Sequence, residues 1–189
     1  LKNEIAKAID EIGFTEVFPV QAQTIPHILA GKDVVCQSHT GSGKTAAFAL
    51  PILEKIQPGQ GIQVLILTPT RELCVQVTET MNEFGRHIHT RAVSVYGGVG
   101  IEPQIRAIKA ADVVVGTPGR VLDHLERKTI KFDNVKYLVL DEADRMFDMG
   151  FIDDVERIIS QVPKDRQTML FSATIGADVH NVVRKHLRS

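Results

Sequence analysis

Apolar residues fall in short continuous runs along this chain, and turns rich in glycine and proline separate them. Their length and their β-branched content predict six strands, at 33–37, 63–69, 91–96, 111–116, 137–140 and 168–171. Most of these runs are apolar throughout and do not alternate with polar residues. Continuous apolar runs are typical of strands that are buried on both faces of a parallel sheet.

Segments with apolar residues at helical spacing lie before and between the predicted strands. They predict helices at 2–12, 20–29, 46–53, 69 or 70 to 84, 102–110, 120–127, 152–162 and 177–187. Strands that alternate with helices imply an α/β fold, with one mostly parallel sheet and helices on both of its faces. We expect residues 1–189 to form a single domain.

Polar and glycine-rich segments follow the carboxyl ends of all six predicted strands. They are residues 38–45, 69–71, 97–98, 117–120, 141–142 and 172–174. Ligands of open α/β sheets bind at this edge. We therefore expect the six segments to line one rim of the sheet.

The composition narrows the class of protein. The 189 residues are 43% hydrophobic and 24% charged, which is typical of a soluble globular domain and argues against disorder. No eighteen-residue apolar run and no signal-peptide pattern are present, so neither a membrane span nor membrane binding is expected. Cys36 and Cys74 lack metal-ligand spacing and are expected to be small core residues, Cys36 in a buried strand.

Other bulk features bear on location and partners. Two unpaired cysteines indicate a reducing compartment, and we expect a cytoplasmic monomer. The formal net charge is −1, so any contact with nucleic acid must be local. The chain does not begin with Met, which indicates a piece excised from a longer protein.

The segment from Ser38 to Thr45 is the strongest local motif. A predicted strand precedes it and a predicted buried helix follows it, which is the context of a phosphate-binding loop, although the strict motif has glycine where Ser38 stands. Glycines allow backbone N–H groups to converge on an anion, and the helix N-terminus adds partial positive charge. Lys44 would reach the β- and γ-phosphates and the Thr45 hydroxyl would bind Mg²⁺. The nucleotide-binding candidates here are Ser38, Thr40, Gly41, Ser42, Gly43, Lys44 and Thr45. The alternative is a glycine-rich turn with an exposed lysine.

Asp141 and Glu142 follow the predicted strand 137–140. A P-loop protein needs an acidic pair at this point, so we assign Asp141 to Mg²⁺, through bound water, and Glu142 to the water that attacks the γ-phosphate. Acids outnumber bases by eight to three over residues 141–165, so most of these acids belong to a solvated face. The alternative for the pair itself is an exposed acidic turn.

The tetrad Asp141-Glu142-Ala143-Asp144, with residues 69–73 upstream and 172–174 downstream, resembles the signature of DEAD-box RNA helicases. Residues 13–21, 97–98 and 117–120 match further signatures, in family order and over nearly the whole chain. The resemblance implies the amino-terminal, RecA-like domain of an ATP-dependent RNA helicase that uses ATP and Mg²⁺. It also implies a missing carboxy-terminal helicase domain that supplies arginine fingers, so we expect weak nucleotide binding and little hydrolysis from this chain alone.

The resemblance also assigns individual residues. Gln21 would read the adenine edge and Phe14 would stack on the base, with Phe18 departing from the small polar residue usual before Pro19. Ser172 and Thr174 would couple hydrolysis to RNA separation, their hydroxyls bonding toward Asp144; Thr174 is alternatively a helix cap. The residues that would contact the RNA backbone, without reading bases, are Pro69, Thr70, Arg71, Gly97, Gly98, Thr117, Gly119 and Arg120. Arg71 is alternatively held in an internal ion pair, and His39 is expected to be exposed.

Three functions remain open at this point. The first is the ATP-binding half of an RNA helicase, with Lys44, Asp141, Glu142, Ser172 and Thr174 as its catalytic set. The second is a DNA-directed motor of the same architecture, which Gln21 and the acidic tetrad disfavour. The third is a non-catalytic RNA-binding module that retains the fold, which the intact Lys44, Thr45, Asp141 and Glu142 disfavour.

Overall fold

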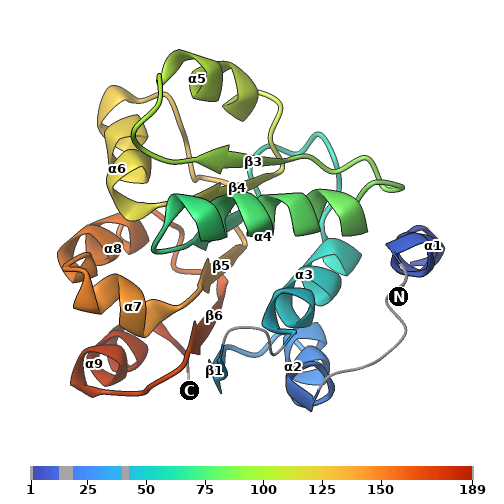
Figure 1. Cartoon of the computed structure of the whole chain (residues 1–189), viewed down its shortest axis with the longest axis horizontal. Coiled ribbons are helices and arrows are strands. Elements are labelled where there is room, and N and C mark those ends of the chain that lie inside the picture. Colours follow the sequence, from blue (N-terminus) through green and yellow to red (C-terminus); the bar gives the residue numbers. More distant parts are fainter. Residues whose placement is uncertain (1, 13–18, 40–42, 189) are drawn as a thin grey trace.

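The structure is a computed structural model, which describes residues 2–12, 19–39 and 43–188. In these ranges a six-stranded sheet forms the centre of the molecule, in the order β1-β6-β5-β2-β4-β3 (Figure 1). Every strand pair is parallel. The strands are β1 (Val34–Gln37), β2 (Val64–Leu67), β3 (Ala92–Val95), β4 (Val113–Gly116), β5 (Tyr137–Leu140) and β6 (Gln167–Ser172). The predicted fold class is therefore confirmed.

Helices cover both faces of the sheet. They are α1 (Asn3–Ile12), α2 (Pro19–Leu29), α3 (Lys44–Lys55), α4 (Arg71–Phe84), α5 (Glu102–Ile108), α6 (Pro118–Arg127), α7 (Ala143–Asp148), α8 (Ile152–Ile159) and α9 (Ala177–His186). Helices α1 to α4 contribute to one apolar core, and α5 to α9 contribute to a second core on the opposite face (Figure 1). None of these helices is long and apolar enough to cross a membrane.

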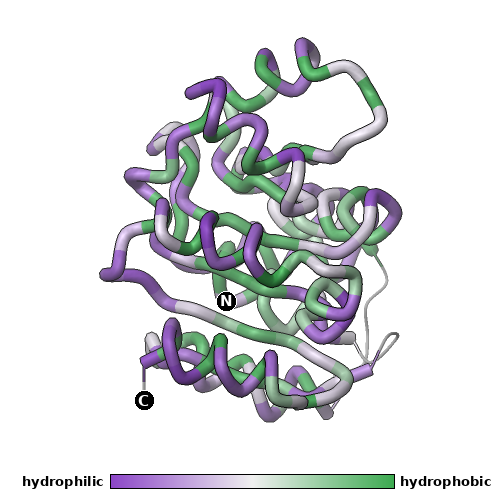
Figure 2. The backbone as a smooth tube through the Cα atoms, turned by 90° about the vertical axis from the view of Figure 1, so that its left-hand side faces the viewer, coloured by the Kyte–Doolittle hydropathy of each residue, from purple (hydrophilic) through white to green (hydrophobic). Residues whose placement is uncertain are grey.

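Strand β2 shows how the sequence builds two cores from one sheet. All four of its residues are buried, and successive side chains of a strand point to opposite faces. Val64 and Ile66 accordingly join the core under α3 and α4, whereas Leu65 and Leu67 join the other core. In Figure 2 the helices alternate between hydrophobic and hydrophilic colours, as expected for elements that bury only one face.

Strand β1 is less buried than predicted. Val35 is 42% exposed and Cys36 is half-buried, so the expectation of a buried strand was wrong here. Strand β1 lies at the edge of the sheet, and of its residues only Val34 and Cys36, which share one face, pack against an apolar core. Cys74 is fully buried as expected, and both thiols are free.

Helix α7 was not predicted. Its acidic residues were expected to belong to a solvated surface, but Ala143, Met146 and Phe147 are buried in the second core. These three positions are spaced as one helical face, while Asp148 on the same helix stays exposed. The acidic composition concealed a short amphipathic helix.

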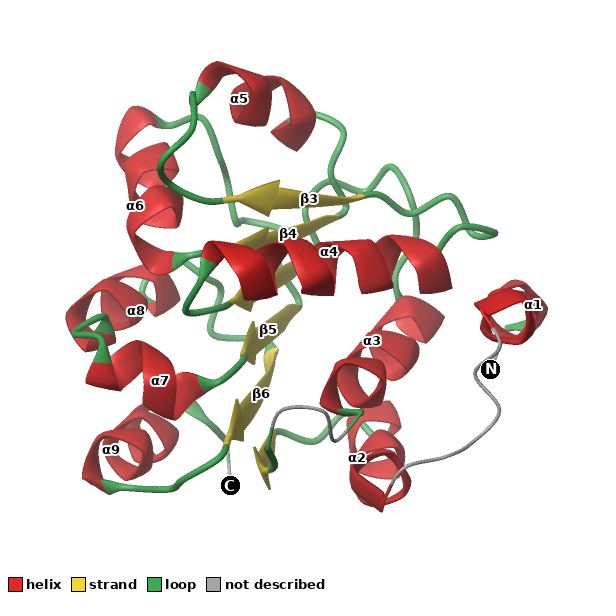
Figure 3. Ribbon diagram, viewed as in Figure 1, coloured by secondary structure: helices red, strands yellow, loops and turns green. Residues whose placement is uncertain are grey.

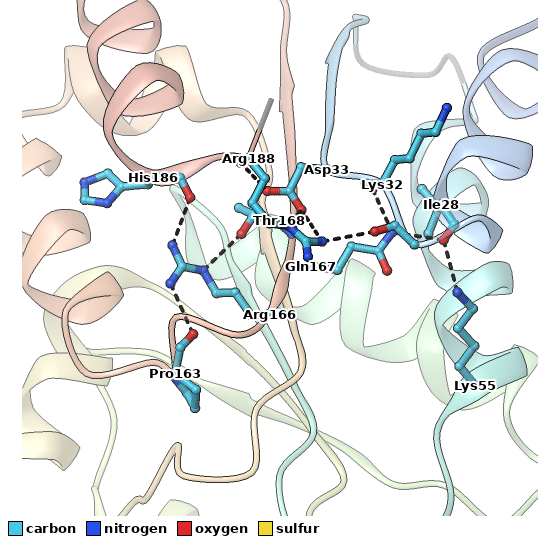
Figure 4. A network of polar contacts seen from close by, with 11 residues as sticks. Ile28, Lys32, Asp33, Lys55, Pro163, Arg166, Gln167, Thr168, His186 and Arg188 are labelled. Carbon is cyan, nitrogen blue, oxygen red and sulfur yellow. Dashed lines mark hydrogen bonds and ion pairs between the residues drawn. The ribbon is translucent and has the colours of Figure 1, made fainter.

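Polar contacts close the sheet at its amino-terminal edge, at the start of β1 and β6 (Figure 4). The carboxylate of Asp33 accepts hydrogen bonds from the Thr168 amide at 2.9 Å and the Arg188 amide at 2.6 Å, and pairs with the Arg188 guanidinium at 3.0 Å. Arg166 donates to the backbone carbonyls of Pro163 and His186. This cluster, which we call the basal clasp, ties the end of α9 to the turn before β1.

Candidate functional site

The carboxyl ends of the six strands meet at one edge of the sheet, as predicted, because all strands run in the same direction (Figure 3). Backbone hydrogen bonds hold the first residue of several rim segments to a neighbouring strand. Ser38 N donates to Ser172 O at 2.9 Å, Asp141 N to Leu67 O at 2.9 Å, and Thr117 N to Val95 O at 3.0 Å. The rim segments therefore start from fixed points.

Lys44 occupies the centre of this rim. It is the first residue of α3 and follows Gly43, whose φ of 81° favours glycine. Its side chain is buried, and its Nζ lies 2.9 Å from Asp141 Oδ1 and 3.2 Å from Glu142 Oε2. The alternative of an exposed lysine on a glycine-rich turn is thereby excluded.

Asp141 is fully buried at the end of β5. Among the described residues neither of its carboxylate oxygens accepts a well-directed hydrogen bond, so the ion pair with Lys44 is its main compensation. Burial raises the pKa of Asp141, while the Lys44 ammonium works to lower it. The alternative of an exposed acidic turn does not apply to this residue.

The oxygen donors near Lys44 fit a hard divalent cation. Asp141 brings buried carboxylate oxygens with unused lone pairs, and Thr45 lies half-buried in the first turn of α3. The described residues contain no cluster of three or more His, Cys, Asp or Glu side chains that could hold a metal alone. A cation here would therefore need further oxygens from phosphate and water.

Glu142 differs from its neighbour in conformation and exposure. It is half-buried and has φ 49° and ψ 52°, a left-handed conformation that is unfavourable by about 1 kcal/mol for a residue with a side chain. One carboxylate oxygen faces Lys44 and the other lies 3.4 Å from Arg145 Nη1. The turn thus directs two successive carboxylates toward one lysine.

A cavity of about 300 Å³ opens beside this group of charges. Gly43, Lys44, Thr45 and Glu142 line one part of it, and residues of α4 line another. A larger cavity of about 370 Å³ lies at the opposite, amino-terminal edge of the sheet. Its lining of lysines and side-chain amides contains no carboxylate, so we place the chemistry in the smaller cavity.

Gln21 is buried, with 1% of its surface exposed, and its Nε2 donates to Gly43 O at 3.1 Å. Ser38 is half-buried, and its hydroxyl has no hydrogen-bond partner among the described residues.

The predicted nucleotide contacts Phe14, Thr40, Gly41 and Ser42, like Phe18, lie outside the described residues. His39 is exposed, as expected.

The contacts predicted for Ser172 and Thr174 are present. Asp144 Oδ2 accepts from Thr174 N at 3.0 Å and from Thr174 Oγ1 at 2.9 Å, and Ser172 Oγ accepts from Asp144 N at 3.1 Å. Burial works to raise the pKa of Asp144, but the hydrogen bonds from Thr174 and nearby amides outweigh it and hold that pKa below its usual value. Thr174 does not cap α9, which begins after Gly176 without a side-chain cap. These bonds join the start of α7 to the segment that follows β6.

The residues predicted to contact RNA lie around the carboxyl ends of β2, β3 and β4. Pro69 is buried, and the Thr70 hydroxyl caps α4 by accepting from Leu73 N at 3.2 Å. Arg71 is exposed and has no ion pair among the described residues. Its guanidinium lies 4.8 Å from the centre of the Tyr96 ring, a cation–π contact that the sequence analysis missed.

The remaining members of this set differ in accessibility. Gly97, Gly98 and Gly119 are exposed, and a Cβ atom at any of them would meet nothing within 4 Å. Thr117 is half-buried at the start of α6. Arg120 points inward, with Nη1 donating to Gln104 Oε1 at 3.2 Å and Nη2 to Val99 O at 2.9 Å. Both terminal nitrogens of its guanidinium therefore donate to groups within the protein.

Comparisons with known proteins agree with this architecture. The family model described as DEAD/DEAH box helicase matches residues 18–182. The chain is 48% identical over 189 residues to the DEAD-box ATP-dependent RNA helicase CshA of Bacillus subtilis (strain 168), and 49% identical over 191 residues to the ATP-dependent RNA helicase CshA of Listeria monocytogenes. These matches take in 99% and 100% of this chain but only 38% and 37% of the relatives.

Two solved structures are also similar. A crystal structure of a DEAD box protein from the hyperthermophile Methanococcus jannaschii has a TM-score of 0.96 at 45% identity, over 99% of this chain and 52% of that chain. A crystal structure of a hypothetical ATP-dependent RNA helicase from Sulfolobus tokodaii has a TM-score of 0.91 at 44% identity, over 98% and 55%. This chain thus spans about half of each solved chain.

Proposed function

Because the chain belongs to the DEAD/DEAH box helicase family, we propose that it is the ATP-binding half of an ATP-dependent RNA helicase. It binds ATP with Mg²⁺ and the backbone of single-stranded RNA. Hydrolysis and unwinding belong to a longer protein with a second helicase domain, since the curated relatives are more than twice the length matched here.

The observation that carries this proposal is the ion pair of Lys44 with Asp141 and Glu142 at the start of α3. A buried lysine held between two carboxylates at a helix N-terminus is placed to exchange one anion for another. In this proposal Lys44 leaves the carboxylates for the β- and γ-phosphates, which the loop amides of residues 38–43 also hold.

Each rim carboxylate has a separate task in this proposal. Asp141 and Thr45 hold Mg²⁺, which when bound neutralises charge on the phosphates. Glu142 orients or deprotonates the attacking water, since its carboxylate is the more accessible of the two. Ser172 and Thr174 keep Asp144 and α7 in register with the segment that follows β6.

Adenine recognition falls to Gln21, whose amide can both donate to and accept from the base edge. Its bond to Gly43 O ties that amide to the phosphate loop before any nucleotide binds. Phe14 supplies the stacking surface in this proposal.

RNA lies along the ends of β2, β3 and β4. The starts of α4 and α6, the exposed Gly97-Gly98 segment and the Arg71 guanidinium offer amides and positive charge to phosphate groups. Amides and guanidinium groups of this kind suit phosphate, so we expect binding to be independent of base sequence.

Replacing Lys44 tests the proposal. Lys44→Ala should abolish measurable ATP binding in calorimetry, because the central phosphate cation is gone, and the domain should stay folded by circular dichroism. Lys44→Gln keeps a hydrogen-bond donor for Asp141 and serves as a second variant in case Lys44→Ala does not fold. Lys136→Ala removes the same charge from an exposed site before β5 and should bind ATP normally. Unchanged ATP affinity in a folded Lys44 variant would refute the assignment.

A further inference from the structure

A buried polar network lies beneath the exposed segment that follows β3, which we call loop 96–100. It consists of Gln104 on α5, Arg120 and His124 on α6, and Thr129 after α6. Gln104 is 7% exposed and His124 is 0% exposed. Nothing in the nucleotide chemistry uses these residues, so their burial calls for another explanation.

The network holds two carbonyl groups of loop 96–100. Gln104 Nε2 donates to Tyr96 O at 2.9 Å, and Arg120 Nη2 donates to Val99 O at 2.9 Å. Both carbonyls therefore point inward, toward α5 and α6.

The orientation of these carbonyls fixes two amide groups. In a trans peptide the C=O and N–H bonds point in opposite directions, and the described residues contain no cis peptide. The N–H groups of Gly97 and Gly100 share peptide units with the Tyr96 and Val99 carbonyls, so they point outward. Neither N–H has an acceptor among the described residues, and both glycines are exposed. Between them Gly98 adopts φ 83°, which favours glycine and turns the chain.

His124 determines how the Gln104 side chain lies. Gln104 Oε1 accepts from Arg120 Nη1 at 3.2 Å and lies 3.0 Å from His124 Nε2. Arg120 can only donate and the Tyr96 carbonyl can only accept, so the amide oxygen must face Arg120 and the amide nitrogen must face Tyr96. His124 Nε2–H donates to the second lone pair of Oε1, while His124 Nδ1 lies 2.7 Å from Thr129 Oγ1.

We propose that His124 is a positioning residue for RNA, which acts through Gln104 and Arg120 to hold the Gly97 and Gly100 amides outward as a two-donor phosphate seat. The proposal rests on the RNA-binding function proposed above and adds Gly100, Gln104 and His124 to it. It also changes the role of Arg120 from a direct phosphate contact to a clamp on the loop.

The test compares RNA and ATP binding by the same variants. His124→Leu removes the bond to Gln104 and leaves no other buried polar group without a partner, because the Thr129 hydroxyl can donate to the carbonyl of residue 124 in place of Nδ1. Its affinity for a fluorescent oligouridylate at low salt should fall about fivefold, the equivalent of one ordinary hydrogen bond. ATP affinity should not change, because the phosphate loop follows β1, at the other end of the sheet from β3.

Three further variants separate positioning from mere stability. His124→Gln restores a donor to Gln104 and should recover RNA affinity. Arg120→Lys keeps the positive charge but loses the two guanidinium nitrogens that donate to Gln104 and Val99. RNA binding should weaken in this variant if Arg120 acts as a clamp, and should stay almost normal if Arg120 contacts phosphate directly. Val155→Ala opens the same core and lowers the melting temperature, yet should bind RNA as the unaltered chain does.

Amide NMR of the unaltered chain supplies the direct readout, since the Gly97 and Gly100 resonances should shift together as oligouridylate is added. Failure of the unaltered chain to bind RNA would overturn the proposed function and this inference with it. The positioning role alone would be overturned if His124→Leu bound RNA with normal affinity. It would also be overturned if the Gly97 and Gly100 amide resonances did not shift when RNA bound.

Discussion

At the scale of single residues, Asp141 and Glu142 show how one turn gives adjacent carboxylates different properties. Asp141 continues β5 into the core and is fully buried, whereas Glu142 turns into a left-handed conformation and stays half-exposed. Both lie within ion-pair distance of Lys44. The buried group suits the holding of a fixed cation, and the accessible group suits work on water.

This difference predicts separable variants in the longer protein. Glu142→Gln keeps nearly the same volume and should retain ATP and RNA binding, while hydrolysis falls about 100-fold or more with the loss of general-base assistance. Asp141→Asn should instead weaken the Mg²⁺-dependent part of ATP binding. Calorimetry with and without Mg²⁺, together with single-turnover hydrolysis, measures both effects. If Glu142→Gln lost ATP binding but hydrolysed bound ATP normally, the two roles would be reversed.

At the scale of elements, the strands were the most predictable part of the chain. The apolar run at 137–140 coincides with β5, and the helix predicted from residue 69 or 70 to 84 corresponds to α4, which begins after the Thr70 cap. Helix α7 was missed because it is short and its three buried apolar positions alternate with the charged residues Asp144, Arg145 and Asp148. The exposure of β1 was also not predicted, because the apolar run Val34-Val35-Cys36 does not show that the strand lies at the edge of the sheet.

The partners of polar side chains were the least predictable part of the site. Arg71 was expected to contact RNA or an internal acid, and the structure adds a contact with the Tyr96 ring that was not predicted. Arg120 was expected to contact RNA, and in the structure its guanidinium donates to Gln104 and Val99. The sequence does not show whether a polar side chain points into the protein or into solvent. Both hydrogen-bond partners of the Arg120 guanidinium also lie outside α6, so the spacing of residues within that helix could not reveal them. By contrast, the family resemblance anticipated the Asp144–Thr174 contact.

The basal clasp gives a prediction about stability. Asp33→Ala removes a buried carboxylate and leaves the Thr168 amide and Arg188 without their acceptor, so it should lower the free energy of unfolding by about 3 kcal/mol. Glu126→Ala breaks an exposed pair with Arg157 and should change that free energy by less than about 1 kcal/mol. Urea unfolding of both variants measures the difference, and equal effects would show that the clasp contributes no more than a surface pair.

At the scale of the whole molecule, the strand order separates two regions of one rim. The phosphate loop, Asp141 and Ser172 follow β1, β5 and β6, which are neighbours at one end of the sheet. The segments proposed to hold RNA follow β2, β4 and β3 at the other end. Each region can therefore be altered without the other, and the two are connected through the sheet.

The stability of the whole domain should depend on pH near neutrality. Burial lowers the pKa of His124 and of His186 below the ordinary 6.5, against the opposing pull of Asp123 on the first and Glu156 on the second. Below pH 6.5 these two histidines bind protons more readily in the unfolded chain than in the folded chain. Their contribution to the free energy of unfolding is therefore fully present above pH 6.5 and is lost as the pH falls below it. The slope should not exceed about 1.4 kcal/mol per pH unit for each histidine.

Urea unfolding at pH 7.5, 6.5 and 5.5 measures this loss. His124→Gln removes one of the two groups and should flatten the dependence in that range, whereas carboxylates with lowered pKa, such as Asp144, act only in more acidic solution. A slope that is the same in His124→Gln and in the unaltered chain would assign the effect to other groups.

The resting ion pair of Lys44 has a thermodynamic consequence. Among the described residues Lys44 is the basic side chain paired with the buried Asp141, whereas Glu142 also pairs with Arg145. If a nucleotide draws Lys44 toward its phosphates, Asp141 loses its paired charge, and a divalent cation bound there would replace it. Nucleotide and cation must then raise each other's affinity by the same factor, as any linked pair of ligands does. We therefore expect ATP and Mg²⁺ to bind this site cooperatively.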